Sequence, residues 1–338
     1  MLGRLGFGDE FQFMFAVLLA LALTFDFLNG FHDSSNIVAT VIASRAMHPR
    51  AALILAALAH LAGPFLFGVA VATTVGDELM EASALTTSAV VAALLAAVVW
   101  NLVTWYLAIP SSSSHALLGG MLGAGLLAVG LGVVKLQGLL KILLALLVSP
   151  LLGLAAGFLI MRLTLWSARR SATSVNQSFR RLQVLTLIGL AFSHGTNDAQ
   201  KTMGVIALGL VTAGMQEGFF VPIWVVAVSA LAIALGTSLG GWRLIRTLGA
   251  RMYRVRPIHG FAAQIAGAGV ILGAALLGGP VSTTQVMSSS IVGVGAGERL
   301  SKVRWNILGE MVVAWLLTIP VSAGLAALAY LGLGLIVR

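Results

Sequence analysis

Long apolar stretches recur along the whole chain and alternate with short polar segments. There are ten of them, at residues 11–44, 51–75, 84–108, 115–134, 142–161, 182–212, 219–241, 258–278, 281–297 and 306–333. About 20 helical residues cross a bilayer, and a backbone within lipid must satisfy its own hydrogen bonds, so most stretches are expected to be helices that cross once. The first and the sixth are longer and contain polar residues in their middle, so they are expected to be helices that are either unbroken or interrupted.

The composition agrees with this pattern. Hydrophobic residues make up 59% of the chain and charged residues 9%, whereas a soluble domain carries about 25% charged residues. A soluble enzyme, a disordered protein and a nucleic-acid binder are therefore excluded. The chain has no cysteine, which excludes disulfides and thiolate metal sites. We expect a multi-pass protein of the cell membrane, with the lipid bilayer as its main solvent and no nucleic-acid partner.

The basic residues predict how the chain is oriented in the membrane. If both termini lie outside the cytoplasm and each stretch crosses once, 15 of the 20 Lys and Arg residues fall in cytoplasmic loops and four fall outside. Cytoplasmic loops carry an excess of Lys and Arg. The net charge of +9 is explained in the same way. We therefore expect extracytoplasmic termini and a cytoplasmic segment 162–181.

Two polar motifs of the first half of the chain return in the second half, in the same order. Residues 29–36 (NGFHDSSN) correspond to residues 194–201 (HGTNDAQK) at an offset of 165. Residues 110–115 (PSSSSH) correspond to residues 280–285 (PVSTTQ) at an offset of 170. Two matches in order at nearly equal offsets indicate an internal repeat.

The two repeats are expected to have opposite orientations in the membrane. Each half contains five apolar stretches, an odd number, so the second half must enter from the other side. Inverted repeats are common in secondary transporters, whose binding sites lie at the midplane between the repeats. We expect an all-α polytopic membrane protein with repeats at 1–161 and 182–338, a basic linker at 162–181, and interrupted or re-entrant helices at the midplane.

Five charged residues lie within the apolar stretches: Asp26, Asp33, Asp198, Lys201 and Glu310. A charge at a helix centre costs about 2.5–3.5 kcal/mol, so such residues are retained where they pair, bind ions or line a water-filled path. Asp33 and Asp198 occupy equivalent positions among amide and hydroxyl side chains, a set of oxygens that suits Na⁺, Mg²⁺ or a proton. The alternative is a paired carboxylate that braces two helices. Glu310 is either a coupling acid or a partner for His or Lys.

The two motifs that follow a proline predict an anion site. Small hydroxylated residues there can begin a helix inside the membrane, and the first amides of a helix have no intrahelical partner. These amides and the positive end of the helix dipole bind anions such as phosphate or sulfate. The alternative is that Ser and Thr promote close helix packing. Equivalent positions in both repeats favour anion binding.

Lys201 occupies the repeat position of Asn36. Its ammonium group either neutralises Asp198 or contacts an anion directly. A further hypothesis is that it occupies the place of a coupling cation, which would make the second half less dependent on external cations. Among the histidines at membrane depth, His115 and His194 flank the motifs and are candidate proton carriers, with hydrogen-bonded packing as the alternative.

Taken together, the paired Gly-x-x-Asp motifs and the PSSSSH and PVSTT stretches resemble the PiT family of inorganic phosphate transporters. Residues 194–204 (HGTNDAQKTMG) are similar to the second-half motif of bacterial low-affinity phosphate permeases. The resemblance covers nearly the whole chain. It implies symport of inorganic phosphate driven by a Na⁺ or H⁺ gradient, and a homodimer with the binding site at the repeat interface. Bacterial members with the Gln-Lys pair are associated with protons and with metal–phosphate complexes.

With this resemblance, the motifs assign candidate site residues. The substrate-binding candidates are Ser111, Ser112, Ser113, Ser114, Ser282, Thr283, Thr284, Asn36, Asn197, Gln200 and Lys201. The coupling candidates for a cation or proton are Asp33, Asp198, His32 and Glu310. His32 stands where the family has Asn, which favours protons at the first site. No cofactor or metal is expected beyond Na⁺ at Asp33 and Asp198.

Other functions fit the sequence less well. A sulfate or other oxyanion permease of the same family is the alternative, although such permeases tend to lack the acidic motifs. An ion channel is disfavoured because inverted repeats with interrupted midplane helices suggest alternating access. An enzyme is not expected, since no paired metal ligands of the His-x-x-x-His type are present. No Gly-x-x-x-x-Gly-Lys-Ser/Thr loop is present either, so ATP is not expected to drive the protein directly.

Overall fold

The computed structural model describes residues 9–170, 175–245 and 255–336, which form helices joined by turns and one isolated β-bridge between Met80 and Val134. The first half contains α1 (Asp9–Ala43), α2 (Pro49–Ala62), α3 (Ala70–Thr73), α4 (Thr87–Tyr106), α5 (Ser113–Val129) and α6 (Leu136–Ala168). The second half contains α7 (Val175–Thr212), α8 (Ile223–Leu239), α10 (Pro257–Leu276), α11 (Thr283–Glu298) and α12 (Trp305–Ile336). Short 3₁₀ turns lie at Gly63–Phe65, Leu131–Val133 and Leu300–Lys302, and a π-helical turn lies at Thr74–Glu78. The expected all-α membrane fold is confirmed.

The helices differ in whether they are long enough to cross a membrane. By length and apolar character α1, α4, α6, α10 and α12 are. Residues Pro49–Phe65 and Ala70–Glu78, which contain α2 and α3, qualify only together and are bent by 72°, as in a broken span or a re-entrant loop. The 38 residues of α7 extend over about 57 Å. In contrast, α5 has 17 residues and α11 has 16, fewer than the roughly 20 that a crossing requires.

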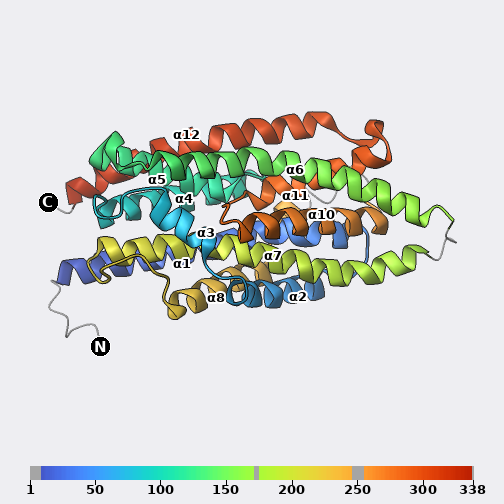
Figure 1. The fold of residues 1–338 in the computed structure, drawn as a ribbon, viewed down its shortest axis with the longest axis horizontal. Helices are drawn as coiled ribbons and strands as arrows, with labels where there is room; N and C mark the ends of the chain where they lie inside the picture. Colours follow the sequence, from blue (N-terminus) through green and yellow to red (C-terminus); the bar gives the residue numbers. More distant parts are fainter. Residues whose placement is uncertain (1–8, 171–174, 246–254, 337–338) are drawn as a thin grey trace.

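The short helices α5 and α11 are arms of re-entrant hairpins. Ten crossings would place the turn before α5 and the turn before α11 on opposite membrane surfaces. Instead, the Ser114 hydroxyl donates to the carbonyl of Val281 at 3.1 Å, so both turns meet inside the protein. Figure 1 shows α4 and α5 in one half of the long axis and α10 and α11 in the other. The expectation of one crossing for each of these stretches is therefore wrong, while the expected re-entrant helices are confirmed.

Helices α1 and α7 run unbroken through their polar motifs, which decides between the unbroken and interrupted helices that the sequence left open. The motif glycines serve close packing instead. A Cβ atom at Gly30 would overlap the carbonyl of Ile233 on α8, and one at Gly195 would overlap the carbonyl of His60 on α2. Because Gly30 and Gly195 are repeat equivalents, the same close contact is made once in each half.

Replacing Gly195 with Ala should lower stability. The new Cβ would lie 2.5 Å from the His60 carbonyl oxygen, and such overpacking costs about 1–3 kcal/mol. Gly189→Ala on the same helix is the matched control, because nothing lies within 4 Å of its added Cβ. The control should gain stability, by up to about 1 kcal/mol from helix propensity. Thermal unfolding in detergent measures both, and equal midpoints would contradict the packing role of Gly195.

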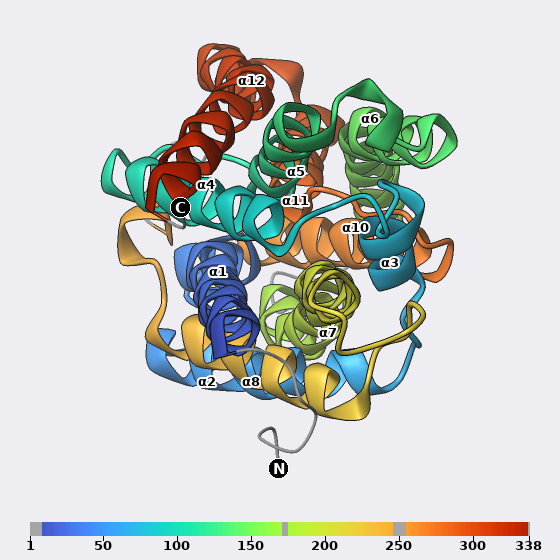
Figure 2. The ribbon, with the colours of Figure 1, turned by 90° about the vertical axis from the view of Figure 1, so that its left-hand side faces the viewer.

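The packing of the helices follows the repeat. Helix α1 lies between α8 and α4, and its equivalent α7 lies between α2 and α10 (Figure 2). In the same way α5 packs on α12, and α11 packs on α6. Each re-entrant hairpin is therefore held by one helix of the other repeat, and α1 and α7 form the centre of the molecule.

The ends of the described chain and the linker lie at opposite ends of the molecule. Helix α1 begins and α12 ends at one end of the long axis, and α6 passes into α7 at the other (Figure 1). Helix α6 continues to Ala168 and α7 begins at Val175, so much of segment 162–181 is helical. Residues 171–174 lie outside the described part, as do residues 1–8, 246–254 and 337–338. Re-entrant hairpins leave every loop on its predicted side, so the charge argument for orientation still holds.

Candidate functional site

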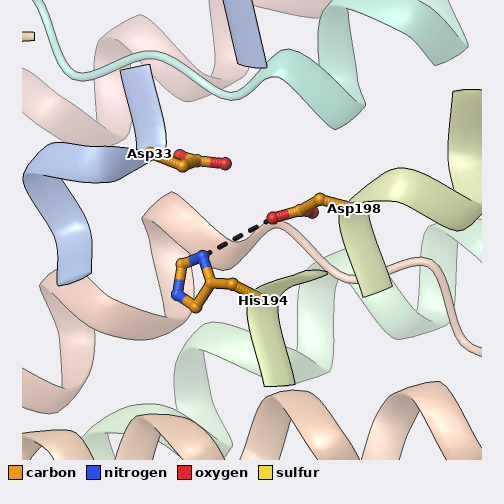
Figure 3. A group of neighbouring side chains, drawn as sticks. All are labelled: Asp33, His194 and Asp198. Atoms are coloured by element: carbon orange, nitrogen blue, oxygen red, sulfur yellow. Dashed lines mark ion pairs between the residues drawn. The ribbon is translucent and has the colours of Figure 1, made fainter. Parts of the chain in front are cut away.

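Three titratable side chains from both repeats meet where the hairpin turns reach α1 and α7. Asp33 on α1, and His194 and Asp198 on α7, each place one oxygen or nitrogen within 4.8 Å of the others. Figure 3 shows the two carboxylates facing each other, with the His194 ring beside them. The His194 Nδ1 atom lies 3.5 Å from Asp198 Oδ2. All three residues are buried.

Asp33 is bound by hydroxyl and amide groups of both repeats. Its Oδ1 accepts from Asn36 Nδ2 at 2.6 Å and from the Thr284 hydroxyl at 3.0 Å. Its Oδ2 accepts from the Thr283 hydroxyl at 3.0 Å. Asn36 Nδ2 also donates to Thr284 Oγ1 at 3.0 Å. The carboxylate of the first repeat is thus tied to the first turn of α11 in the second.

Asp198 has the corresponding contacts, made by a lysine. The Lys201 ammonium donates to Asp198 Oδ1 at 2.5 Å, to Ser114 Oγ at 2.8 Å and to the carbonyl of Val281 at 2.7 Å. At the two motif offsets, Lys201 is the equivalent of Asn36 and Ser114 is the equivalent of Thr284. The same pair of contacts, to the aspartate three residues earlier and to a hydroxyl on the opposite hairpin, is therefore made in each half.

Both hairpin turns end in a hydroxyl-capped helix N-terminus. The Ser112 hydroxyl accepts from the His115 amide at 3.1 Å, and the Ser282 hydroxyl accepts from the Gln285 amide at 3.4 Å. Such caps define where α5 and α11 begin. A helix N-terminus presents amides and the positive end of the dipole, which bind anions. Two such ends meet beside the carboxylates, so the arrangement suits an anion held together with a cation.

Several predicted site residues hold the surrounding helices in place. Asn197 Nδ2 donates to the carbonyl of Gly279 in the α10–α11 turn at 3.0 Å. Gln200 Oε1 accepts from the Val71 amide near the start of α3 at 2.8 Å. The hydroxyl of Ser113 donates to Asn29 on α1 at 2.6 Å, and that of Ser111 donates to Thr104 on α4 at 2.8 Å. Each of these contacts joins a hairpin or α3 to α1, α4 or α7.

Two coupling candidates are not brought into the cluster. His32 Nε2 donates to the carbonyl of Asn101 on α4 at 2.8 Å, so its ring contacts α4 and not the carboxylates. Glu310 is exposed on α12 and lines a surface groove with Trp100, Pro110 and other residues. These positions favour a packing role for His32 and a surface role for Glu310. The sequence did not reveal which face of α12 is covered, because the helix is apolar almost all round.

His194 joins the site although the motifs do not assign it there. The sequence marks it only as a candidate proton carrier, but its spacing of four residues from Asp198 places both on one helix face. The ring of His60 on α2 stacks on it with centroids 6.0 Å apart, and His60 Nδ1 lies 2.8 Å from Thr237 Oγ1 on α8. A buried chain of polar groups therefore leads from Asp198 towards α8.

Some polar atoms of the site have no hydrogen-bond partner among the described residues. They are Asn36 Oδ1, Asn197 Oδ1, Asp198 Oδ2 and both ring nitrogens of His194. Buried polar atoms are nearly always hydrogen-bonded in native proteins. Asn36 Oδ1 and Asn197 Oδ1 are acceptors and are available to donors of a bound ligand, whereas Asp198 Oδ2 faces His194 Nδ1 at 3.5 Å.

Comparisons with known proteins agree with the geometry. The model of the phosphate transporter family matches residues 29–175 and 166–326. The probable low-affinity inorganic phosphate transporter of Bacillus subtilis is 42% identical over 324 residues, covering 95% of this chain and 97% of the relative. A protein of Rhizobium meliloti with the same description is 43% identical, covering 94% and 96%. A solved structure of a sodium-dependent phosphate transporter has a TM-score of 0.86 at 25% identity, and the match covers 96% of this chain and 99% of that one.

Proposed function

Because the chain belongs to the phosphate transporter family, we propose that it is a secondary symporter of inorganic phosphate in the cell membrane, driven by a Na⁺ or H⁺ gradient. The observation that carries this proposal is the meeting of two helix N-termini with two carboxylates between inverted repeats. The match to the phosphate transporter family confirms the resemblance to the PiT family. A membrane-embedded enzyme is set aside, because the family is one of transporters.

The charges of the site give each group a role. Asp33 and Asp198 would repel an entering phosphate, and Lys201 balances only one of them. A coupling cation or proton at Asp33 removes the remaining repulsion, which is strong where water is excluded. Phosphate then docks on the hydroxyls and amides of the turns that begin α5 and α11. The two hairpins enter from opposite ends, so each is placed to close the site on its own side.

The free acceptors of the site favour phosphate over sulfate. Phosphate carries at least one proton near neutral pH, and its hydroxyl can donate to Asn36 Oδ1 or Asn197 Oδ1, which lack hydrogen-bond partners among the described residues. Sulfate has no proton to donate. A buried acceptor that stays unpaired costs about 1–3 kcal/mol, enough for roughly 5- to 150-fold selectivity.

Uptake of radiolabelled phosphate into proteoliposomes tests the proposal. We expect an imposed Na⁺ or H⁺ gradient to accelerate uptake, and a tenfold excess of sulfate to compete weakly. The ion that stimulates identifies the coupling ion. Uptake that neither gradient stimulates would contradict symport, and strong competition by sulfate would favour the oxyanion permease alternative.

The predicted orientation is part of the proposal and can be tested by labelling. The natural chain has no cysteine, so single cysteines give no background. Glu217 and Ser178 are both exposed, near opposite ends of α7. A membrane-impermeant maleimide should label Glu217→Cys in intact cells and Ser178→Cys only after permeabilisation. The reverse pattern would contradict extracytoplasmic termini and a cytoplasmic linker.

A homodimer, which the resemblance implies, is likewise proposed. Its measurement is the mass of the purified protein in detergent, corrected for bound detergent. A mass of about two chains supports the dimer, and a mass of one chain contradicts it.

A further inference from the structure

The two halves of the site are equivalent in position but differ in charge. In the first half Asn36, a neutral residue, contacts Asp33 and the Thr284 hydroxyl. In the second half Lys201, a cation, contacts Asp198 and the Ser114 hydroxyl. Among the described residues, the first half thus carries a carboxylate, Asp33, that no Lys or Arg contacts. The second half carries a carboxylate, Asp198, that is paired with an ammonium group.

We infer that the Lys201 ammonium group permanently fills the second-half site, where its repeat equivalent would leave room for an external coupling cation. The protein then needs one external cation fewer for each phosphate than a protein with Asn at both equivalent positions would need. This inference rests on the proposed symport. It means that one residue, Lys201, sets how many external coupling cations are bound with each phosphate.

The contacts of the ammonium group are those of a bound cation. Its three acceptors are a carboxylate oxygen, a hydroxyl oxygen and a main-chain carbonyl oxygen. Carboxylate, hydroxyl and carbonyl oxygens are the ligands of hard cations. They come from α7 and from both hairpin turns, so the ammonium group connects the same elements that an ion shared between the repeats would connect. Lys201 is also 1% exposed, which excludes a role at the surface.

The same contacts disfavour Lys201 as a direct phosphate ligand. An ammonium group has three donors and no acceptor, and here all three are used. Contact with phosphate would require breaking one of them. By contrast, no Lys or Arg contacts Asp33 in the described part of the chain, so an external cation is needed there.

The test counts the Na⁺ ions that the purified protein binds. Wild type, Lys201→Asn and the control Lys302→Asn are dialysed against radiolabelled Na⁺ in detergent, with choline as the replacement cation and without phosphate. Lys302 is an exposed lysine paired with Glu298 at the end of α11, so the control removes the same charge outside the site. We expect Lys201→Asn to bind one more Na⁺ per chain than wild type, and Lys302→Asn to match wild type. Equal numbers in Lys201→Asn and wild type would overturn the inference.

A stability measurement keeps the inference testable if Lys201→Asn unfolds readily. Without the ammonium group Asp198 Oδ1 is a buried carboxylate oxygen without a cation, and only His194 remains beside the other oxygen. A bound external cation should restore the lost stability. We expect Na⁺ to raise the unfolding temperature of Lys201→Asn well above its value in choline, with a much smaller shift in Lys302→Asn. The same instability in both salts would overturn the inference. Failure of the proposed symport is seen separately, as absence of gradient-driven phosphate uptake by wild type.

Discussion

Asp33→Asn should reduce gradient-driven phosphate uptake to the level of protein-free liposomes while the protein stays folded. The neutral amide is nearly isosteric and removes the one carboxylate of the site that has no cationic partner among the described residues. The substitution therefore mimics the site with its cation bound, and phosphate should still stabilise the purified variant against heat. Normal gradient-driven uptake by Asp33→Asn would contradict the coupling role.

Asp198→Asn should also abolish uptake, but at a cost in stability that Asp33→Asn does not share. It would leave the Lys201 ammonium group buried without its carboxylate, and breaking a buried ion pair in this way costs about 3–5 kcal/mol. The double variant Asp198→Asn/Lys201→Asn removes both charges and should recover much of that stability. Thermal unfolding of the three variants checks this order. Equal destabilisation by Asp33→Asn and Asp198→Asn would show that Lys201 does not pair with Asp198 alone.

The repeat made most of the site predictable. The offsets of 165 and 170 residues pair Asp33 with Asp198, Asn36 with Lys201 and Ser114 with Thr284, and the structure brings these pairs to corresponding contacts. Matching offsets carry this information because inverted repeats place equivalent residues around one axis at the midplane. The fold class followed from the same pattern.

The hairpins and the helix faces were harder to predict for a physical reason. An apolar stretch is equally favourable against lipid and against protein, so hydropathy does not tell a crossing helix from a re-entrant one. Helix length does not tell them apart either, because α8 has 17 residues, as many as α5. The role of Gly30 does not follow from the sequence, since glycine permits both unwinding and close approach, and only the packing on Ile233 decides between them. The position of Glu310 does not follow either, because α12 is apolar almost all round.

Thr284→Val should shift the cation dependence of phosphate uptake strongly without unfolding the protein. The substitution keeps the shape of the side chain but removes the hydroxyl that donates to Asp33 and accepts from Asn36. A hydrogen bond to a charged group is worth about 1.5–3 kcal/mol. Here it stabilises the carboxylate without its cation, so the loss should lower the cation concentration needed for half-maximal uptake by roughly 10- to 150-fold. Uptake measured against cation concentration in proteoliposomes gives this shift.

Thr318→Val is the matched control for this substitution. Thr318 is equally buried, but its hydroxyl donates only to the carbonyl of Ala314 within α12. Its uptake curve should therefore follow that of wild type. If Thr284→Val and Thr318→Val behaved alike, the tie between the first turn of α11 and Asp33 would have no part in coupling. A shift confined to Thr284→Val would instead mean that the second repeat sets the cation affinity of the first, which links cation binding to the position of a hairpin.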